Sequence, residues 1–150
     1  MYRGANHLNL DEKGRITMPT RYRSEILASC GGRLVITVDT AHCLMIYPFP
    51  QWERIEEALM SRPNMDRQVR RLQRMLVGNA HEAEMTAQGR ILVAPSLREF
   101  AGLKKQVTLV GQGNKFELWD AERWKAQTEL WLAEEAELEG ASEALSSLQL

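Results

Sequence analysis

One short pattern occurs twice in this chain of 150 residues: a Gly-Arg pair, a β-branched run and a proline. Gly14-Arg15-Ile16 matches Gly89-Arg90-Ile91 at an offset of 75 positions. Pro19 matches Pro95 at 76, which predicts one extra residue, a bulge, in the second copy. Further matches follow at an offset of 72: Val35–Val38 with Val107–Val110, Leu44–Tyr47 with Phe116–Trp119, and Trp52 with Trp124. The chain therefore contains a duplicated module.

Each copy carries the signals of a strand, a glycine turn, a second strand, a short helix and a β-hairpin. A module of this size cannot bury a core by itself, so we expect the two copies to share one. The predicted fold class is α+β and mainly β: a pseudo-twofold β-barrel with peripheral helices. The residues expected to point into its core are Ile16, Ile36, Ile46, Ile91, Leu109 and Leu118.

The sequence divides into four parts: repeat 1 at 5–52, a helical connector at 53–80, repeat 2 at 81–124, and an acidic C-terminal helix and tail at 125–150. The connector is predicted to form two helices interrupted near Pro63, with Asp66 as the N-cap of the second. Four arginines share one face of that second helix: Arg67, Arg70, Arg71 and Arg74. This stripe could contact DNA or pair with an acidic helix, and the glutamates of the C-terminal part favour the second.

Apolar residues recur every seven positions in the C-terminal part: Trp124, Trp131, Leu138 and Leu145. Such a helix either lies on its own barrel or contacts another subunit. We therefore regard Trp124 and Trp131, together with the arginine stripe, as candidate contacts between subunits. The helical signal ends near Gly140.

The net charge of −1 conceals an uneven distribution. Residues 1–115 carry 17 Lys and Arg against 11 Asp and Glu, whereas residues 116–150 carry 2 against 9. Fourteen of the basic residues are arginine, which binds phosphate and guanine through a planar fork. A basic body with an acidic tail is typical of a chain that faces a polyanion, although a merely solvated surface has the same composition.

Signals for catalysis are scarce. The three histidines are scattered, and the phosphate loop, nucleophile elbow and metal-ligand spacings that mark common enzymes are missing from the sequence. We expect no enzyme activity, no cofactor, no metal and no small-molecule substrate. We expect Cys30 and Cys43 to be buried small hydrophobic residues of a cytoplasmic protein. No apolar run is long enough for a membrane span, and we expect neither a signal peptide nor a membrane partner.

The Gly-Arg turns are the candidate DNA contacts. Asp11 and Arg15 stand four positions apart across a tight bend, where a carboxylate and a guanidinium can pair and fix the loop, and Gly14 and Gly89 allow each turn. Basic residues cluster around both turns: Lys13, Arg15, Arg21, Arg23, Arg90 and Arg98. Either they contact phosphates and guanine edges, or the turn arginines only brace their hairpins. For Arg15 we favour DNA.

These residues resemble the MraZ family. The resemblance rests on Tyr2-Arg3-Gly4, the Leu10–Arg15 turn, Gly89-Arg90-Ile91 and the segment Val110–Trp119, and it runs from the first residue to about Trp124. It implies two SpoVT/AbrB-type repeats that form a swapped-hairpin barrel and assemble into ring-shaped homo-oligomers. It adds Arg3 to the DNA-contact candidates.

The resemblance also implies a function. Members are bacterial transcriptional regulators that bind short direct repeats in DNA and repress their own operon in the division and cell-wall gene cluster, on the nucleoid in the cytoplasm. The family's D-x-x-x-R motif falls on Asp11 and Arg15, but its second copy has Thr86 before Arg90. The second hairpin is therefore expected to be looser or more purely cationic. The alternative function is a protein-interaction module, an antitoxin-like barrel whose acidic tail binds a protein partner.

Overall fold

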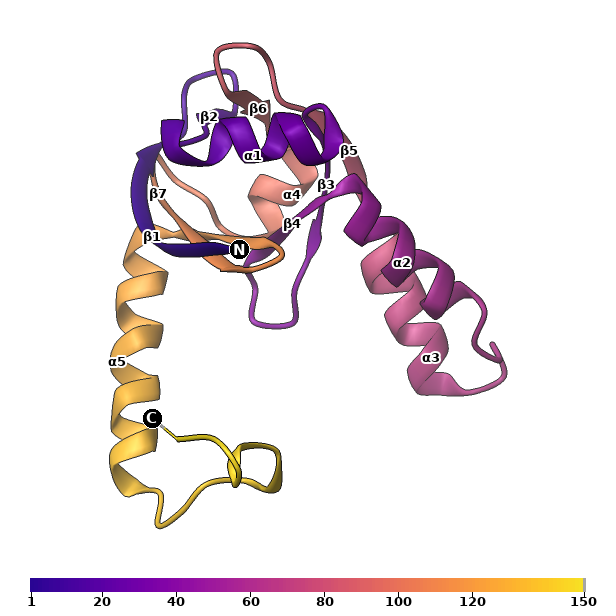
Figure 1. The fold of residues 1–150 in the computed structure, drawn as a ribbon, viewed down its shortest axis with the longest axis vertical. Coiled ribbons are helices and arrows are strands. Elements are labelled where there is room, and N and C mark those ends of the chain that lie inside the picture. Colours follow the sequence, from indigo (N-terminus) through magenta and orange to yellow (C-terminus); the bar gives the residue numbers. More distant parts are fainter. Residues whose placement is uncertain (150) are drawn as a thin grey trace.

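A six-stranded antiparallel sheet and a separate two-stranded ribbon form the β-structure; of the five α-helices, α1 (Thr20–Cys30) and α4 (Pro95–Phe100) lie against the strands and the others extend away from them (Figure 1). This arrangement comes from a computed structural model, which describes residues 1–149. The elements in chain order are β1 (Tyr2–Asn9), β2 (Arg15–Thr17), α1 (Thr20–Cys30), β3 (Arg33–Val38), β4 (Leu44–Pro48), α2 (Phe49–Met60), α3 (Arg67–Leu72), the π-helix η1 (Gln73–Val77), β5 (His81–Glu84), β6 (Arg90–Leu92), α4 (Pro95–Phe100), β7 (Gln106–Gly113), β8 (Phe116–Asp120), α5 (Ala121–Glu137) and the short 3-10 helix η2 (Glu143–Leu145).

The two repeats exchange strands in the large sheet, whose order is β1-β7-β8-β4-β3-β5. The hairpins β3–β4 and β7–β8 are those expected from the sequence, and they meet where β4 pairs with β8. Beside them, β1 of the first repeat pairs with β7 of the second, and β5 of the second pairs with β3 of the first. Neither repeat has a complete sheet of its own, because each supplies the edge strand of the other.

The ribbon pairs β2 with β6 around one central contact. Ile16 lies opposite Ile91, while Arg15 lies opposite Leu92 and Thr17 opposite Arg90. If each residue is replaced by its equivalent 75 positions away, the same three pairs result, so the pairing is symmetric between the two repeats. Side chains alternate along a strand, so Ile16 and Ile91 share the inner face and are fully buried.

The core lies between the ribbon and the large sheet. The six expected core residues are all buried to 1% exposure or less and belong to one hydrophobic cluster, so this prediction is confirmed. The closed barrel is not confirmed, and the fold is mixed α and β, not mainly β, because the α-helices contain more residues than the strands. The strands β1 and β5 are edges with one partner each, and the short β2 and β6 pair only with each other.

The predicted bulge before Pro95 is wrong. Pro19 precedes the first residue of α1, and the equivalent position before α4 is Ala94, so Pro95 is already the first helical residue. The offset of 75 continues without interruption into both helices. Proline fits either position, because its fixed φ suits the residue before a helix and its first residue alike.

Two helical arms extend from the body (Figure 1). One is the antiparallel pair of α2 with α3 and η1, interrupted near Pro63 as predicted, where the side chain of Asp66 accepts hydrogen bonds from the backbone of Gln68 and Val69. The other is α5, which ends at Glu137, three residues before the expected Gly140. Among the described residues, no helix combines the length and the apolar character that crossing a membrane requires.

Candidate nucleic-acid interface

Both Gly-Arg turns lie side by side at one end of the molecule, above the β2/β6 ribbon (Figure 1). The inner face of the ribbon is buried core, so the outer face carries the alternate residues. These are the partly exposed Arg15 and the exposed Thr17, Arg90 and Leu92. The sequence predicted the two arginines but missed Thr17 and Leu92, although the period of two in "RIT" and "RIL" carries the signal.

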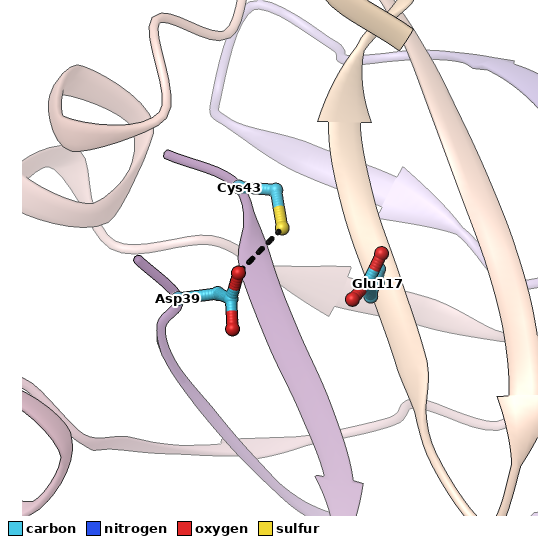
Figure 2. A group of neighbouring side chains, drawn as sticks. All are labelled: Asp39, Cys43 and Glu117. Carbon is cyan, nitrogen blue, oxygen red and sulfur yellow. Dashed lines mark hydrogen bonds between the residues drawn. The ribbon is translucent and has the colours of Figure 1, made fainter. Parts of the chain in front are cut away.

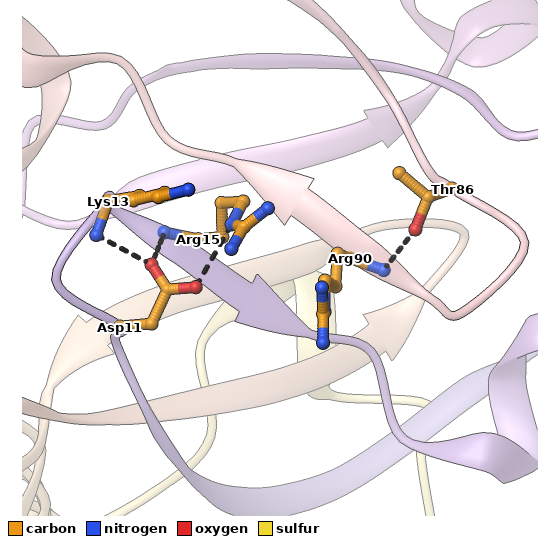
Figure 3. Close-up of polar contacts among 5 residues, drawn as sticks. All are labelled: Asp11, Lys13, Arg15, Thr86 and Arg90. Atoms are coloured by element: carbon orange, nitrogen blue, oxygen red, sulfur yellow. Dashed lines mark hydrogen bonds and ion pairs between the residues drawn. The ribbon is translucent and has the colours of Figure 1, made fainter.

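Asp11 organises the first turn (Figure 3). Its Oδ1 accepts hydrogen bonds from the backbone N–H groups of Lys13 at 2.9 Å and Arg15 at 2.8 Å, and its Oδ2 accepts one from Arg15 Nε at 3.0 Å. These contacts, above all the one with the Arg15 N–H, lower the pKa of the Asp11 carboxyl below its ordinary value. The carboxylate therefore closes the turn and fixes the start of the Arg15 side chain.

Thr86 occupies the position of Asp11 in the second turn. Its Oγ1 accepts a hydrogen bond from the Arg90 N–H at 3.0 Å, but it offers no carboxylate to the guanidinium (Figure 3). The backbone bonds that close the two turns are otherwise the same, including Gly14 N–H to Asp11 O at 3.0 Å and Gly89 N–H to Thr86 O at 2.9 Å. The expected loosening is therefore not visible in the backbone. Arg90 has no acidic partner among residues 1–149.

Arg23 and Arg98 lie under the turns, each against the turn of the other repeat. Arg98 Nε donates to the carbonyl of Val93, and Arg23 Nε donates to the carbonyl of Met18. The guanidinium of Arg98 passes directly beneath Gly14, and that of Arg23 passes beneath Gly89. Both glycines have a positive φ of about the same size, 82° and 84°. Each repeat thus supports the other's turn, which the sequence comparison did not predict.

The other two expected DNA contacts lie on the β1–α1 side of the body. Arg21 donates to Asn6 Oδ1 at 2.6 Å and to the Tyr22 hydroxyl at 2.7 Å, which holds it against β1. Arg3 is exposed on β1, and its carbonyl accepts the Tyr22 hydroxyl. The structure therefore brings together Lys13, Arg15 and Arg90 at the ribbon, with Arg23 and Arg98 behind them.

Comparison with known proteins places this geometry in a family. The family model described as "MraZ protein, putative antitoxin-like" matches the chain twice, at residues 1–75 and 76–146. This chain belongs to the MraZ family. A protein of Thioalkalivibrio sulfidiphilus is 61% identical over 150 residues, with all of both chains covered. Others come from Methylococcus capsulatus, 53% identical over 140 residues with 93% of this chain and 91% of the relative covered, and Pseudomonas aeruginosa, 50% identical over 134 with 89% of each covered. All three relatives bear the name transcriptional regulator MraZ.

The arginine stripe lies far from the ribbon, on the exposed side of the α3 arm. Arg67, Arg70, Arg71 and Arg74 line one shallow concavity together with Met75. In Figure 1 this arm and α5 leave the body at different places. Within one chain, accordingly, none of the four is in an ion pair among the described residues, and the expected pairing with the acidic helix does not occur inside the molecule.

The remaining aromatic candidates form a cluster at the base of α5. Trp124 and Trp131 pack edge-on at 5.9 Å between ring centroids, and each also contacts Trp119. Trp131 remains 37% exposed. Both residues thus have contacts in their own chain, and Trp131 keeps a free face.

One group among residues 1–149 has the donor set of a metal site: Asp39, Cys43 and Glu117, whose ligand atoms lie within 4.8 Å of one another (Figure 2). Burial, then the neighbouring carboxylates, raises the pKa of the Cys43 thiol far above its usual range. The thiol stays protonated and points at Asp39 Oδ2, which also accepts the backbone N–H of Ala41. These contacts brace the β3–β4 turn.

Proposed function

We propose that this chain is a DNA-binding transcriptional regulator and that the outer face of the β2/β6 ribbon enters the major groove. One observation carries the proposal: a two-stranded antiparallel ribbon, rigidly seated on the core by Ile16 and Ile91, presents Arg15 and Arg90 outward. The major groove of B-DNA admits such a ribbon, and arginine is the side chain that most often reads guanine there.

The two arginines differ in how they are held, which gives them different roles. Asp11 fixes Arg15 through its Nε and leaves the end of the guanidinium for a base edge. Arg90, without a carboxylate, keeps its full positive charge for a base or a phosphate. Lys13 at the first turn supplies a phosphate contact, and Arg23 and Arg98 add positive charge while they support the turns.

The regulator binds short direct repeats in the promoter of its own operon and represses that operon, which belongs to the division and cell-wall gene cluster. It works on the nucleoid in the cytoplasm as a ring-shaped homo-oligomer. The support for these statements is the resemblance to the MraZ family, and the relatives' names support the role in transcription.

The test is binding to the DNA upstream of the chain's own gene, measured by fluorescence anisotropy over a series of salt concentrations. We expect Arg15→Ala to weaken specific binding by roughly 5- to 150-fold, which corresponds to about 1–3 kcal/mol for one lost guanine contact. The matched control is Arg54→Ala, which removes an exposed arginine of α2 and leaves the ribbon untouched.

Two results would contradict the proposal. Wild-type protein that does not bind its upstream DNA at low salt excludes the function. Equal binding by wild type, Arg15→Ala and Arg90→Ala excludes the ribbon as the interface and makes the turn arginines braces.

The alternative, an antitoxin-like module that captures a protein with its tail, has less support. A tail that wraps a partner is extended, whereas this one is a helix through Glu137. Truncation after Glu139 distinguishes the two functions. It leaves DNA binding unchanged if the ribbon is the interface, and it abolishes partner capture if the tail is.

A further inference from the structure

The internal repeat makes α2 and α5 equivalent helices. Each begins directly after the second strand of its hairpin, and Trp52 of α2 corresponds to Trp124 of α5. The surroundings of the two helices differ. Trp52 is only 3% exposed, because Leu76 and Val77 of η1 pack over the cluster it belongs to. Gln73 also donates to the carbonyl of Leu59 at 3.1 Å, which fastens η1 to the end of α2.

No helix covers the corresponding face of α5 in the part of the chain that the structure describes. Trp124 is only partly buried, and Trp131, which corresponds to Leu59, is 37% exposed. Leu132 of α5, and Leu138 just beyond the end of this helix, are more than 60% exposed. Within residues 1–149, α5 therefore lacks the equivalent of the helix that covers α2, and its apolar side chains there stay exposed.

The charges at the end of α5 are also uncompensated. Glu134, Glu135 and Glu137 lie in its last turn, at the negative end of the helix dipole, and no basic residue accompanies them there. Residues 126–149 contain no lysine or arginine at all. Locally this arrangement is unfavourable, so a cation from outside the segment stabilises it.

The arginine stripe on α3 and η1 has an excess of positive charge. Its four guanidinium groups are exposed, crowd one concavity and have no carboxylate partner among residues 1–149. The spacing of the stripe is i, i+3, i+4, i+7. The face of α5 that carries Trp131, Glu134 and Glu135 has the first three of these spacings, over roughly 6 Å of helix.

We infer that α5 of one copy of this chain docks on the arginine stripe of a second copy. Glu134 and Glu135 meet the guanidinium groups, and Trp131 lies against the stem of an arginine or against Met75 beside the stripe. The two surfaces are different patches on different arms, so the contact is heterologous and passes from copy to copy. This inference names the contact of the oligomer proposed above and does not depend on the DNA contact.

The test is the molar mass in solution, measured by sedimentation velocity. We expect wild type at a multiple of the 17.1 kDa chain mass, and both Arg70→Glu/Arg71→Glu and Glu134→Arg/Glu135→Arg at 17.1 kDa. When the two variants are mixed, both kinds of contact are complementary. The acidic helix of the first variant meets the basic stripe of the second, and the basic helix of the second meets the acidic stripe of the first. An equimolar mixture, like a chain with both reversals, therefore recovers the wild-type mass.

Matched controls are Arg54→Glu on α2 and Glu143→Arg in η2, which change the same charges at exposed positions outside the two surfaces and leave the mass unchanged. Circular dichroism verifies that every variant is folded. A monomeric wild type, a reversal without effect on mass, or a mixture that fails to reassemble overturns the inference. If the stripe reversal weakens DNA binding and leaves the mass unchanged, the stripe is a nucleic-acid surface instead. Loss of DNA binding by Arg15→Ala, with an intact oligomer, tests the proposed function separately.

Discussion

The carboxylate of Asp11 binds three N–H groups, while its counterpart Thr86 binds one with an uncharged hydroxyl. Because the pKa of Asp11 is lowered in the folded protein, its stabilisation of the first turn is complete above the ordinary aspartate pKa of about 3.9. It is lost as the pH falls through the lower, folded value. An NMR titration should show the amide signals of Lys13 and Arg15 shifting below pH 3.9. The Arg90 amide is the internal control, since Thr86 does not titrate. An Asp11 pKa at or above its ordinary value would contradict the prediction.

Gly14 and Gly89 leave the space in which the arginine of the other repeat passes beneath each turn. A Cβ on Gly14 would lie 2.6 Å from Cζ of Arg98, and the positive φ adds strain. We expect Gly14→Ala to lower the free energy of unfolding by about 2–4 kcal/mol. The control is Gly31→Ala: Gly31 also has a positive φ, but a Cβ there meets nothing within 4 Å, so the change should cost about 1 kcal/mol. Chemical denaturation measures both, and equal losses would mean that the guanidinium moves aside freely.

At the scale of elements, local sequence patterns predicted the features that depend on neighbouring residues, namely turns, hairpins and helix caps. The period of two, the turn glycines and the Asp66 cap gave the hairpins and the interrupted connector their places. Pairings between distant strands carry no comparable signal, so local patterns alone could not predict the β1–β7 pairing or the open edges; only the family resemblance implied an exchange between the repeats. Aligning Pro19 with Pro95 failed because proline suits two neighbouring positions at a helix start. For the candidate site, Arg15 and Arg90 were visible in the sequence, but the crossing of Arg23 and Arg98 depends on the tertiary fold.

The α3 arm provides a local test of its cap. Asp66 satisfies two backbone N–H groups at the start of a six-residue helix, which is too short to be stable without such support. We expect Asp66→Ala to destabilise the arm by about 1 kcal/mol and Asp66→Ser to retain most of the stability. Hydrogen exchange should therefore speed up at residues 67–77 in the alanine variant and stay unchanged in β3 and β4. Uniformly faster exchange throughout the chain would show that the arm and the core unfold together.

At the scale of the whole molecule, the two proposed surfaces divide the work. In these proposals the basic ribbon end of the body faces DNA, and α5 and the stripe connect copies through opposite charges. An oligomer held in this way keeps the acidic helices occupied, so that they do not repel the DNA phosphates beside the ribbons. These two contacts together explain the uneven charge distribution of the sequence: the basic body faces DNA, and the acidic C-terminal helix faces the basic stripe of another copy.

This division predicts how binding depends on the number of DNA sites. When several ribbons of one oligomer engage tandem repeats, each further contact is intramolecular, so affinity rises steeply from one repeat to two or more. The slope of log K against log salt steepens in proportion, because more phosphates are neutralised. For Arg70→Glu/Arg71→Glu, which is expected to be monomeric, affinity for a single repeat should be unchanged and the gain on tandem repeats should disappear. Arg15→Ala should lose affinity for both DNAs. Anisotropy titrations on one-repeat and tandem-repeat duplexes measure this, and a stripe variant that keeps the tandem gain would show that the assembly does not use the stripe.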